Sequence, residues 1–276
     1  MTNPLIQAYR KPALYVSLPS GGNYYKEKPK LSVDGELAIY SMTARDELIS
    51  KTPDALFNGE ATFSLIKSCA PDIADAHDMP VNDLMVVLIA IRMASHGDTI
   101  SVDIKCPKCS HLNQLGISTA GLLSTVEENK SSDHIILDND FKVNCKPYSL
   151  ADRTLLQIQR IKQAKLIEGL NNEDLTDEER QIRFGETFIE IADITVTLIA
   201  NAITQVSPPE GEKVADHNMI LEWLKSITKD DYDKIKNCVE DLSENNIDTK
   251  FDASCQACEH TWKTTIDLDI ANFFVG

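Results

Sequence analysis

Two cysteine pairs with the same short spacing constrain this chain more than any other feature of its sequence. Two residues separate Cys106 from Cys109, and two residues separate Cys255 from Cys258. A spacer of this length lets one tight turn present two thiolates to the same ion, and zinc needs four soft donors at tetrahedral angles. The pattern therefore predicts one structural zinc site whose ligands are Cys106, Cys109, Cys255 and Cys258.

The residues around each pair have the alternation of β-strands. Ile100, Val102 and Ile104 alternate with polar residues before the first pair, and a similar pattern from Trp262 to Leu268 follows the second. Two such hairpins facing each other are typical of a zinc ribbon. Compact ribbons have roughly 15 to 20 residues between their pairs. Here the separation is about 145 residues, so the sequence predicts a ribbon that is split by a helical insertion.

Two other readings of the four cysteines stay open at this stage, and a third is disfavoured. The same thiols could hold an iron-sulfur cluster, or each pair could be a reduced or disulfide-bonded motif without metal. A thioredoxin-like redox centre is disfavoured, because that motif needs a helix after the cysteines. The residues after Cys109 instead indicate a turn that returns to a strand.

The sequence shows no set of residues that would make the chain an enzyme. His111 and His260 each follow a cysteine pair by two residues, but four cysteines already complete a zinc site. We therefore expect both imidazoles to pack beside the turns, and a metal with no vacant position to have no catalytic role. No Ser/His/Asp arrangement and no phosphate-binding glycine loop occurs. The three cysteines without partner spacing are expected to be buried thiols: Cys69, Cys145 and Cys238.

Charge and hydropathy argue against nucleic acid and membranes as partners. The 276 residues include 27 Lys and Arg against 43 Asp and Glu, a net charge of -16 that repels a phosphate backbone. The longest apolar run, Leu84 to Ile91, is far shorter than the roughly 20 residues of a membrane span and predicts a buried helix. The first residues lack the regions of a secretory signal, so we expect a reducing cytosol.

The expected fold class is α+β, with helical layers, short β elements and the split zinc ribbon. Aromatic residues make up 6% of the chain and aliphatic residues are plentiful, which suits helices packed on a small amount of sheet. We expect four segments along the chain: an extended arm at 1–35, a helical region with the first zinc hairpin at 36–118, a mainly helical insertion at 119–246, and the second zinc hairpin at 247–276.

Capping and turn signals place the helices within this plan. Thr43 with Asp46 and Glu47, and Ser149 with Asp152, each indicate a helix start. Other helices are expected at 53–58, 60–69, 82–96, from Thr176 to just before Pro208, at 218–227 and at 230–242. Strands are expected at 37–40 and within 134–146.

The arm contains a glycine turn with aromatic neighbours. In the segment Leu18-Pro19-Ser20-Gly21-Gly22-Asn23-Tyr24-Tyr25, two glycines beside a proline indicate a turn, and tyrosines follow it. Such side chains would face water in a free arm, so we expect the arm to dock on a partner subunit. The alternative is that the arm folds back on the core of its own chain.

Three segments of the sequence together resemble a viral family. They are Leu18 to Tyr25, then Thr43-Ala44-Arg45-Asp46-Glu47 with Pro53-Asp54-Ala55-Leu56-Phe57-Asn58-Gly59, and then Ile91-Arg92-Met93-Ala94-Ser95-His96-Gly97 leading into the first cysteine pair. Their order and separation resemble the baseplate hub or hub-assembly proteins of T-even-type contractile-tailed bacteriophages. The resemblance covers about the first 120 residues well. It implies a structural or chaperoning role at the tail baseplate, and it brings no catalytic residues with it.

Resemblance and residues together favour a non-catalytic protein of a phage tail baseplate hub, folded around a structural zinc. Its expected partners are other baseplate or tail subunits, with no membrane and no small-molecule substrate. Its expected location is the host cytoplasm during assembly and the virion tail baseplate if it is retained. Two alternatives stay open, a tail assembly chaperone absent from the virion and a zinc-ribbon nucleic-acid-binding module. The second lacks a basic patch, because acidic residues offset Lys105, Lys108, Lys250 and Lys263.

Overall fold

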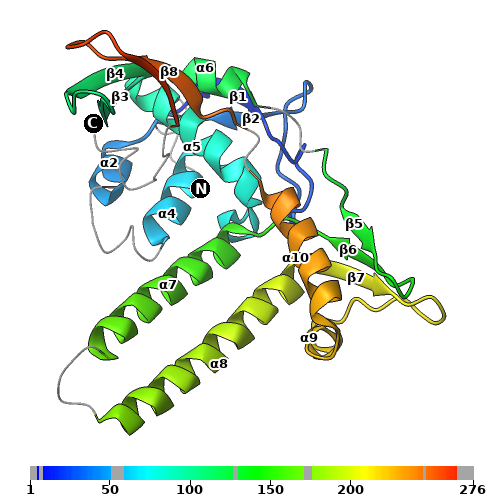
Figure 1. Ribbon diagram of the computed structural model, residues 1–276. Helices are drawn as coiled ribbons and strands as arrows, with labels where there is room; N and C mark the ends of the chain where they lie inside the picture. The colour runs from blue at the N-terminus through cyan, green and yellow to red at the C-terminus, as the bar shows by residue number, and fades with distance from the viewer. Residues whose placement is uncertain are drawn as a thin grey trace. The chain divides into compact units, whose positions relative to one another are not determined.

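The computed structural model describes residue 5 and residues 9–50, 59–126, 130–170, 176–244 and 247–265. Helices and small antiparallel sheets make up these residues, so the prediction of an α+β fold is confirmed (Figure 1). The chain forms two compact units, residues 1–129 with 245–276 (unit 1) and residues 130–244 (unit 2). Both cysteine pairs belong to unit 1, and unit 2 lies between them in the sequence. The four-segment division given above stays a prediction.

Unit 1 is built from a central helix, shorter helices around it, and three two-stranded antiparallel sheets among the described residues. Its elements are β1 (Leu14–Ser17), β2 (Glu36–Ile39), α2 (Ala44–Ser50), α4 (Glu60–Cys69), η1 (Ala76–Asp78), α5 (Val81–His96), β3 (Thr99–Lys105), β4 (Leu112–Ser118), α6 (Thr119–Ser124), β8 (Lys250–Ser254) and β9 (Thr261–Thr265). The sheets pair β1 with β2, β3 with β4 and β8 with β9.

Helix α5 is the core of unit 1, as its sequence predicts. Every residue from Leu84 to Ile91 is at most 4% exposed, which leaves no solvent face along the middle of the helix. Pro80 precedes the helix, where its missing N–H costs nothing. Gly97 ends it with a φ of 85°, a conformation that glycine adopts without strain.

The segment Leu18 to Tyr25 does not form an exposed arm. Leu18 is 5% exposed and Tyr25 8%, and the preceding strand β1 pairs with β2 of the same unit. The turn surrounds Asp83 of α5. Ser20 donates its N–H (2.8 Å) and its hydroxyl (2.5 Å) to that carboxylate, and the Tyr25 hydroxyl also donates (2.9 Å). The expectation that these side chains face water is therefore wrong, and the segment folds back on the core of its own unit, which was the alternative. A buried carboxylate on α5 requires donors, and this segment supplies them.

Unit 2 combines a three-stranded sheet with four helices among its described residues. Its elements are β5 (His134–Ile136), β6 (Lys142–Cys145), α7 (Leu150–Leu170), α8 (Asp177–Ala202), β7 (Ile203–Ser207), α9 (His217–Leu224) and α10 (Lys229–Ser243). The antiparallel sheet has the order β5-β6-β7. Its core is formed by buried aliphatic side chains of β6, α8, β7, α9 and α10, among them Val143, Ile199, Val206, Ile220 and Ile235.

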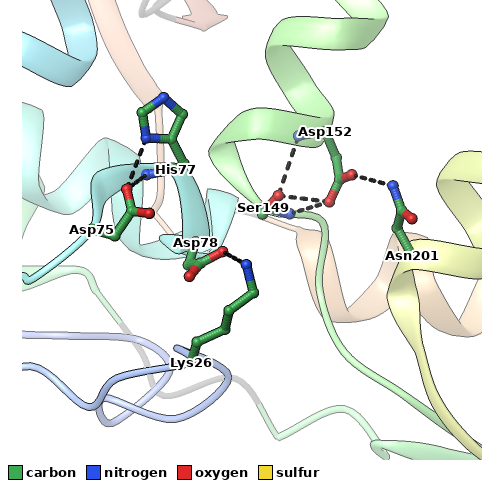
Figure 2. Close-up of polar contacts among 7 residues, drawn as sticks. All are labelled: Lys26, Asp75, His77, Asp78, Ser149, Asp152 and Asn201. Carbon is green, nitrogen blue, oxygen red and sulfur yellow. Dashed lines mark hydrogen bonds and ion pairs between the residues drawn. The ribbon is translucent and has the colours of Figure 1, made fainter. Parts of the chain in front are cut away.

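Helices α7 and α8 run side by side as a long hairpin (Figure 1). The capping box predicted at Ser149 is present, since the Ser149 N–H (3.0 Å) and hydroxyl (2.7 Å) both donate to Asp152 Oδ2. Asp152 N–H donates back to the Ser149 hydroxyl at 3.2 Å. The second carboxylate oxygen accepts from Asn201 Nδ2 of α8 at 3.0 Å, as Figure 2 shows. One buried carboxylate thus caps α7 and joins it to the end of α8.

One predicted boundary is wrong. The helix expected from Thr176 to just before Pro208 ends at Ala202, and the next five residues, Ile203–Ser207, form strand β7. Ile203 and Val206 are buried in the core of unit 2, and β6 offers an edge on which the segment pairs. Backbone pairing with β6 therefore outweighs the helical pattern at this end.

Several expectations fall on residues that the structure does not describe, namely the helix at 53–58 and the strand residues Ile266 and Leu268. The other predicted elements are present to within a few residues. Thr228 caps α10 as expected, because its hydroxyl accepts from the Asp231 N–H at 3.2 Å. No helix in the described part of the chain is long and apolar enough to cross a membrane.

Candidate metal centre

The four cysteines of the two pairs lie together at the tips of two hairpins. Cys106 Sγ is 3.8 Å from Cys258 Sγ, and Cys109 Sγ is 3.6 Å from Cys255 Sγ. All four sulfurs lie within 4.8 Å of one another. Zinc-sulfur bonds of about 2.3 Å at tetrahedral angles place the sulfurs about 3.8 Å apart. The donor set therefore fits a tetrahedral metal ion, and four free thiols are brought to one point from pairs about 145 residues apart.

Each cysteine pair lies in its own turn, and the two turns have the same backbone hydrogen bonds. In the hairpin β3–β4, Cys106 N–H donates to the His111 carbonyl at 2.9 Å, and Ser110 N–H donates to the Cys106 carbonyl at 2.9 Å. In the hairpin β8–β9, Cys255 N–H donates to the His260 carbonyl and Glu259 N–H to the Cys255 carbonyl, both at 2.9 Å. The identical spacing in the sequence thus produces identical backbone hydrogen bonding in both hairpins.

Each turn contains a strained residue at the same position. Ser110 has a φ of 59° and Glu259 a φ of 55°, in the left-handed region that glycine adopts without cost. For other residues this region costs about 1 kcal/mol or more. The turn geometry is therefore imposed by the hairpin and the cysteines rather than preferred by these two side chains.

Replacing Ser110 and Glu259 with glycine should raise the stability of unit 1. We expect each change to add up to about 1 kcal/mol to the free energy of unfolding, because relief of the left-handed strain exceeds the added disorder of the unfolded chain. Denaturant unfolding of the metal-loaded protein measures the effect. Ser101→Gly, in the exposed row of β3, is the matched control and should lower stability. Equal losses from Ser110→Gly and Ser101→Gly would contradict the assignment of strain to the turn.

Asn113 joins the two hairpins and was not predicted as a site residue. Its side chain is fully buried, and its Nδ2 donates to the carbonyls of His111 (3.1 Å) and Ile104 (3.4 Å). Its Oδ1 accepts from the N–H of Gln256, inside the other cysteine pair, at 2.8 Å. The signal was present in the sequence, because Asn113 occupies an inward position of β4 where an apolar residue is expected.

Hydrogen bonding to the sulfurs favours a thiolate at Cys255. Burial raises the pKa of Cys255, but backbone N–H groups of Ala257 and Cys258 and neighbouring thiols donate to its sulfur and lower the pKa to about 6. The His111 N–H lowers the pKa of Cys109, yet its hydrogen bonds with the other three sulfurs raise that pKa to about 12. Cys255 therefore loses its proton before Cys109, and the turn stabilises its thiolate, the form that binds a metal ion.

The histidines beside the pairs lie outside the group of converging donors. Among the described residues, the group that could hold a metal consists of the four cysteines alone. His111 and His260 contribute their backbone carbonyls, and the His260 ring stacks on Trp262 with centroids 6.0 Å apart. Cys69 is fully buried elsewhere in unit 1, and Cys145 and Cys238 belong to unit 2.

Two segments that carry the family resemblance meet at the end of α5. The Ser41 hydroxyl donates to the Ala94 carbonyl at 2.7 Å, and Met42 N–H donates to the Ser95 hydroxyl at 2.9 Å. His96 Nε2 lies 3.0 Å from Glu47 Oε1. Together with the hydrogen bonds to Asp83, these contacts connect the described parts of the resembling segments to helix α5.

Polar contacts near η1 hold the loop that leads into α5. Asp75 caps η1 by accepting from the His77 N–H at 2.9 Å, and its carboxylate also contacts the His77 ring at 2.8 Å. Lys26 pairs with Asp78 at 2.7 Å (Figure 2). These hydrogen bonds lower the pKa of Asp75, with the backbone N–H of His77 as the largest cause. The exposed pairs position the loop and provide no metal-binding donors.

Comparison with known proteins gives one match. No curated protein and no solved structure matches the chain. A family model described as T4 bacteriophage base plate protein matches residues 13–275, which includes both units and both cysteine pairs. The family expected from the three resembling segments is thereby confirmed, and the match extends through the helical insertion that those segments do not cover. The chain belongs to the family of T4 bacteriophage base plate proteins.

Proposed function

We propose that the chain is a non-catalytic structural or assembly protein of a phage baseplate hub, folded around one structural zinc. The family match over residues 13–275 carries the baseplate role. The four sulfurs at tetrahedral spacing support the metal, with Cys106, Cys109, Cys255 and Cys258 as its ligands. The ion would supply a cross-link between two hairpins. Four protein donors would complete its coordination, which gives it no open position for chemistry.

The hairpins β3–β4 and β8–β9 form a split zinc ribbon in this proposal. Half-buried apolar residues alternate along β3, and Ala253 of β8 is buried opposite Trp262 of β9. Each hairpin alone has too little buried surface to be stable. Joining them through the ion and Asn113 produces a single folded module, with unit 2 inserted between its halves.

The proposed partners are other baseplate or tail subunits. The protein would act in the host cytoplasm during assembly, and in the tail baseplate if it stays in the particle. Quantitative mass spectrometry of purified mature particles and of baseplate precursors tests the role. A hub subunit should occur in both at fixed copy number, whereas an assembly factor should occur in precursors alone. The proposal would be refuted if the chain is absent from wild-type baseplate precursors and a phage that lacks the chain still forms normal baseplates.

The protein should not bind DNA at physiological salt. Binding through phosphates needs clustered cations, and this chain has a net charge of -16. Fluorescence anisotropy with labelled duplex and single-stranded DNA should show no saturable binding up to about 100 µM protein, weaker than ordinary non-specific binding. Saturable binding that weakens steeply with added salt would instead support the alternative of a zinc-ribbon nucleic-acid-binding module.

A further inference from the structure

Two cysteines outside the metal centre lie together in unit 2. Cys145 is the last residue of β6 and is 2% exposed, in the hydrophobic core. Cys238 lies in α10, is partly buried, and packs against the cluster that contains Cys145. The sequence gives no hint of this pairing, because about 90 residues separate the two cysteines.

Backbone contacts fix the two residues beside each other. The Cys238 thiol donates to the carbonyl of Ser132 at 3.5 Å, and Cys145 N–H donates to the carbonyl of Asp133 at 2.7 Å. Ser132 and Asp133 are consecutive residues, so Cys238 and Cys145 bind neighbouring carbonyls of one short segment, and helix α10 packs against β6. The proximity of the two thiols raises the pKa of Cys145 and lowers that of Cys238.

We propose that Cys145 and Cys238 are an oxidation site that closes into an intramolecular disulfide by exchange with a low-molecular-weight disulfide such as oxidised glutathione. The Cys238 thiolate, which solvent reaches, attacks one sulfur of oxidised glutathione and releases one reduced glutathione. The Cys145 thiol then loses its proton and attacks the Cys238 sulfur of the mixed disulfide. A second reduced glutathione leaves. Two protein thiols are thus oxidised while one glutathione disulfide is reduced to two thiols.

In the metal-loaded protein the other five cysteines should not compete in this reaction, because four of them would be bound to the proposed ion. Cys69 is fully buried, and its burial raises its pKa to about 12, so almost no reactive thiolate forms there. The four cysteines of the metal centre converge on one ion site. The oxidation would tie α10 to β6 and so cross-link the sheet and a helix of unit 2. A bond between such distant residues stabilises a fold mainly by restricting its unfolded chain.

Incubation of the reduced, metal-loaded full chain with oxidised glutathione tests the site. Intact mass should fall by two hydrogens, and tryptic digestion without reductant should link the peptides 143–153 and 237–250. The melting temperature should rise by several degrees and return to its starting value after dithiothreitol. Zinc content should not change.

Matched variants separate this bond from general oxidation. Cys145→Ser should stop at one glutathione adduct on Cys238 with no rise in melting temperature, and Cys238→Ser should stay unmodified at residue 145. Cys69→Ser should behave as the wild type. A stable glutathione adduct on Cys238 of the wild type, unmodified thiols in both peptides, or a link to any other cysteine would each overturn the proposal.

Discussion

Changing Cys255 to serine should remove the metal and separate the two halves of the ribbon. Wild-type protein purified reduced and without chelator should contain one zinc per chain, and the variant much less than one. Closing a chain of about 145 residues costs about 4 kcal/mol, and an ion that binds only the folded form offsets this cost. Cys255 is the informative position, because it is the buried sulfur that receives two backbone N–H groups.

Elemental analysis and limited proteolysis measure the two parts of this expectation. Loss of the ion should expose new cleavage sites near Lys105 and Lys250, at the strands that flank the cysteine turns. The two tryptophans report the units separately, since Trp262 lies in β9 and Trp223 packs on the core of unit 2. Emission from Trp262 should change on metal removal, while emission from Trp223 should stay the same. Trp223→Phe and Trp262→Phe versions assign each signal.

Control variants distinguish ligands from neighbours. His111→Ala and His260→Ala should retain one zinc per chain, because both residues contribute backbone carbonyls rather than ring nitrogens to the turns. Asn113→Ala should retain the ion but bind it more weakly, because the Gln256 N–H loses its acceptor. Absence of metal from protein purified reduced and without chelator would refute the zinc proposal. Iron together with visible absorption would instead indicate an iron-sulfur cluster.

Replacing Asp83 with alanine should destabilise unit 1 by about 3 kcal/mol or more. Three donors converge on this fully buried carboxylate, and each buried donor left without an acceptor costs about 1–3 kcal/mol. Asp83→Asn should cost less, because its side chain keeps an acceptor for the Ser20 N–H and the two hydroxyls can rotate to accept. Tyr25→Phe removes one donor and should cost about 1 kcal/mol. Denaturant unfolding of the metal-loaded protein gives all three values.

The same residue should give the protein a defined pH dependence. Burial raises the pKa of Asp83 to about 6, although hydrogen bonds from Ser20 and Tyr25 oppose that rise. The folded protein therefore holds this proton up to a higher pH than the unfolded chain, whose carboxyl has a pKa near 4. The stability that this proton contributes is complete below about pH 4 and is lost as pH rises through about 6.

Comparison with Asp83→Asn isolates this effect from all other titrating groups. The stability of the wild type minus that of the variant should fall between about pH 4 and pH 6 and be level above that range. A flat difference across this range would show that Asp83 titrates as in the unfolded chain. A difference that increases with pH would show that the three donors dominate over burial.

Local signals in this sequence predicted most of the elements. The helix start at Thr43, the capping box at Ser149 and the helix end at residue 96 each depend on nearby residues, and the structure shows all three. The four cysteines were found because the same short spacing occurs twice in the sequence. Features that depend on distant partners were missed. Strand β7 forms because β6 lies beside it. The roles of Asn113 and Asp83 depend on hydrogen-bond partners on other elements, which neighbouring residues in the sequence do not reveal.

The exposed-arm expectation failed for the same reason. Ser20, Tyr25 and the glycine turn between them indicate a flexible surface segment when they are read alone. Asp83, about 60 residues later, converts them into a buried hydrogen-bonded turn. Asp83, directly before the apolar run that begins at Leu84, was the available signal, because a carboxylate buried in that helix requires donors from elsewhere.

The split of the ribbon also sets an order of events during synthesis. A ribosome that adds about 5 to 20 residues per second completes Cys109 roughly 7 to 29 seconds before Cys255. During that interval the first pair has two of its four sulfurs, while unit 2, with its own hydrophobic core, emerges and can fold. Capture of the proposed ion by all four cysteines would therefore be a late event, and a nascent chain that stops inside unit 2 would carry only two of the four proposed ligands.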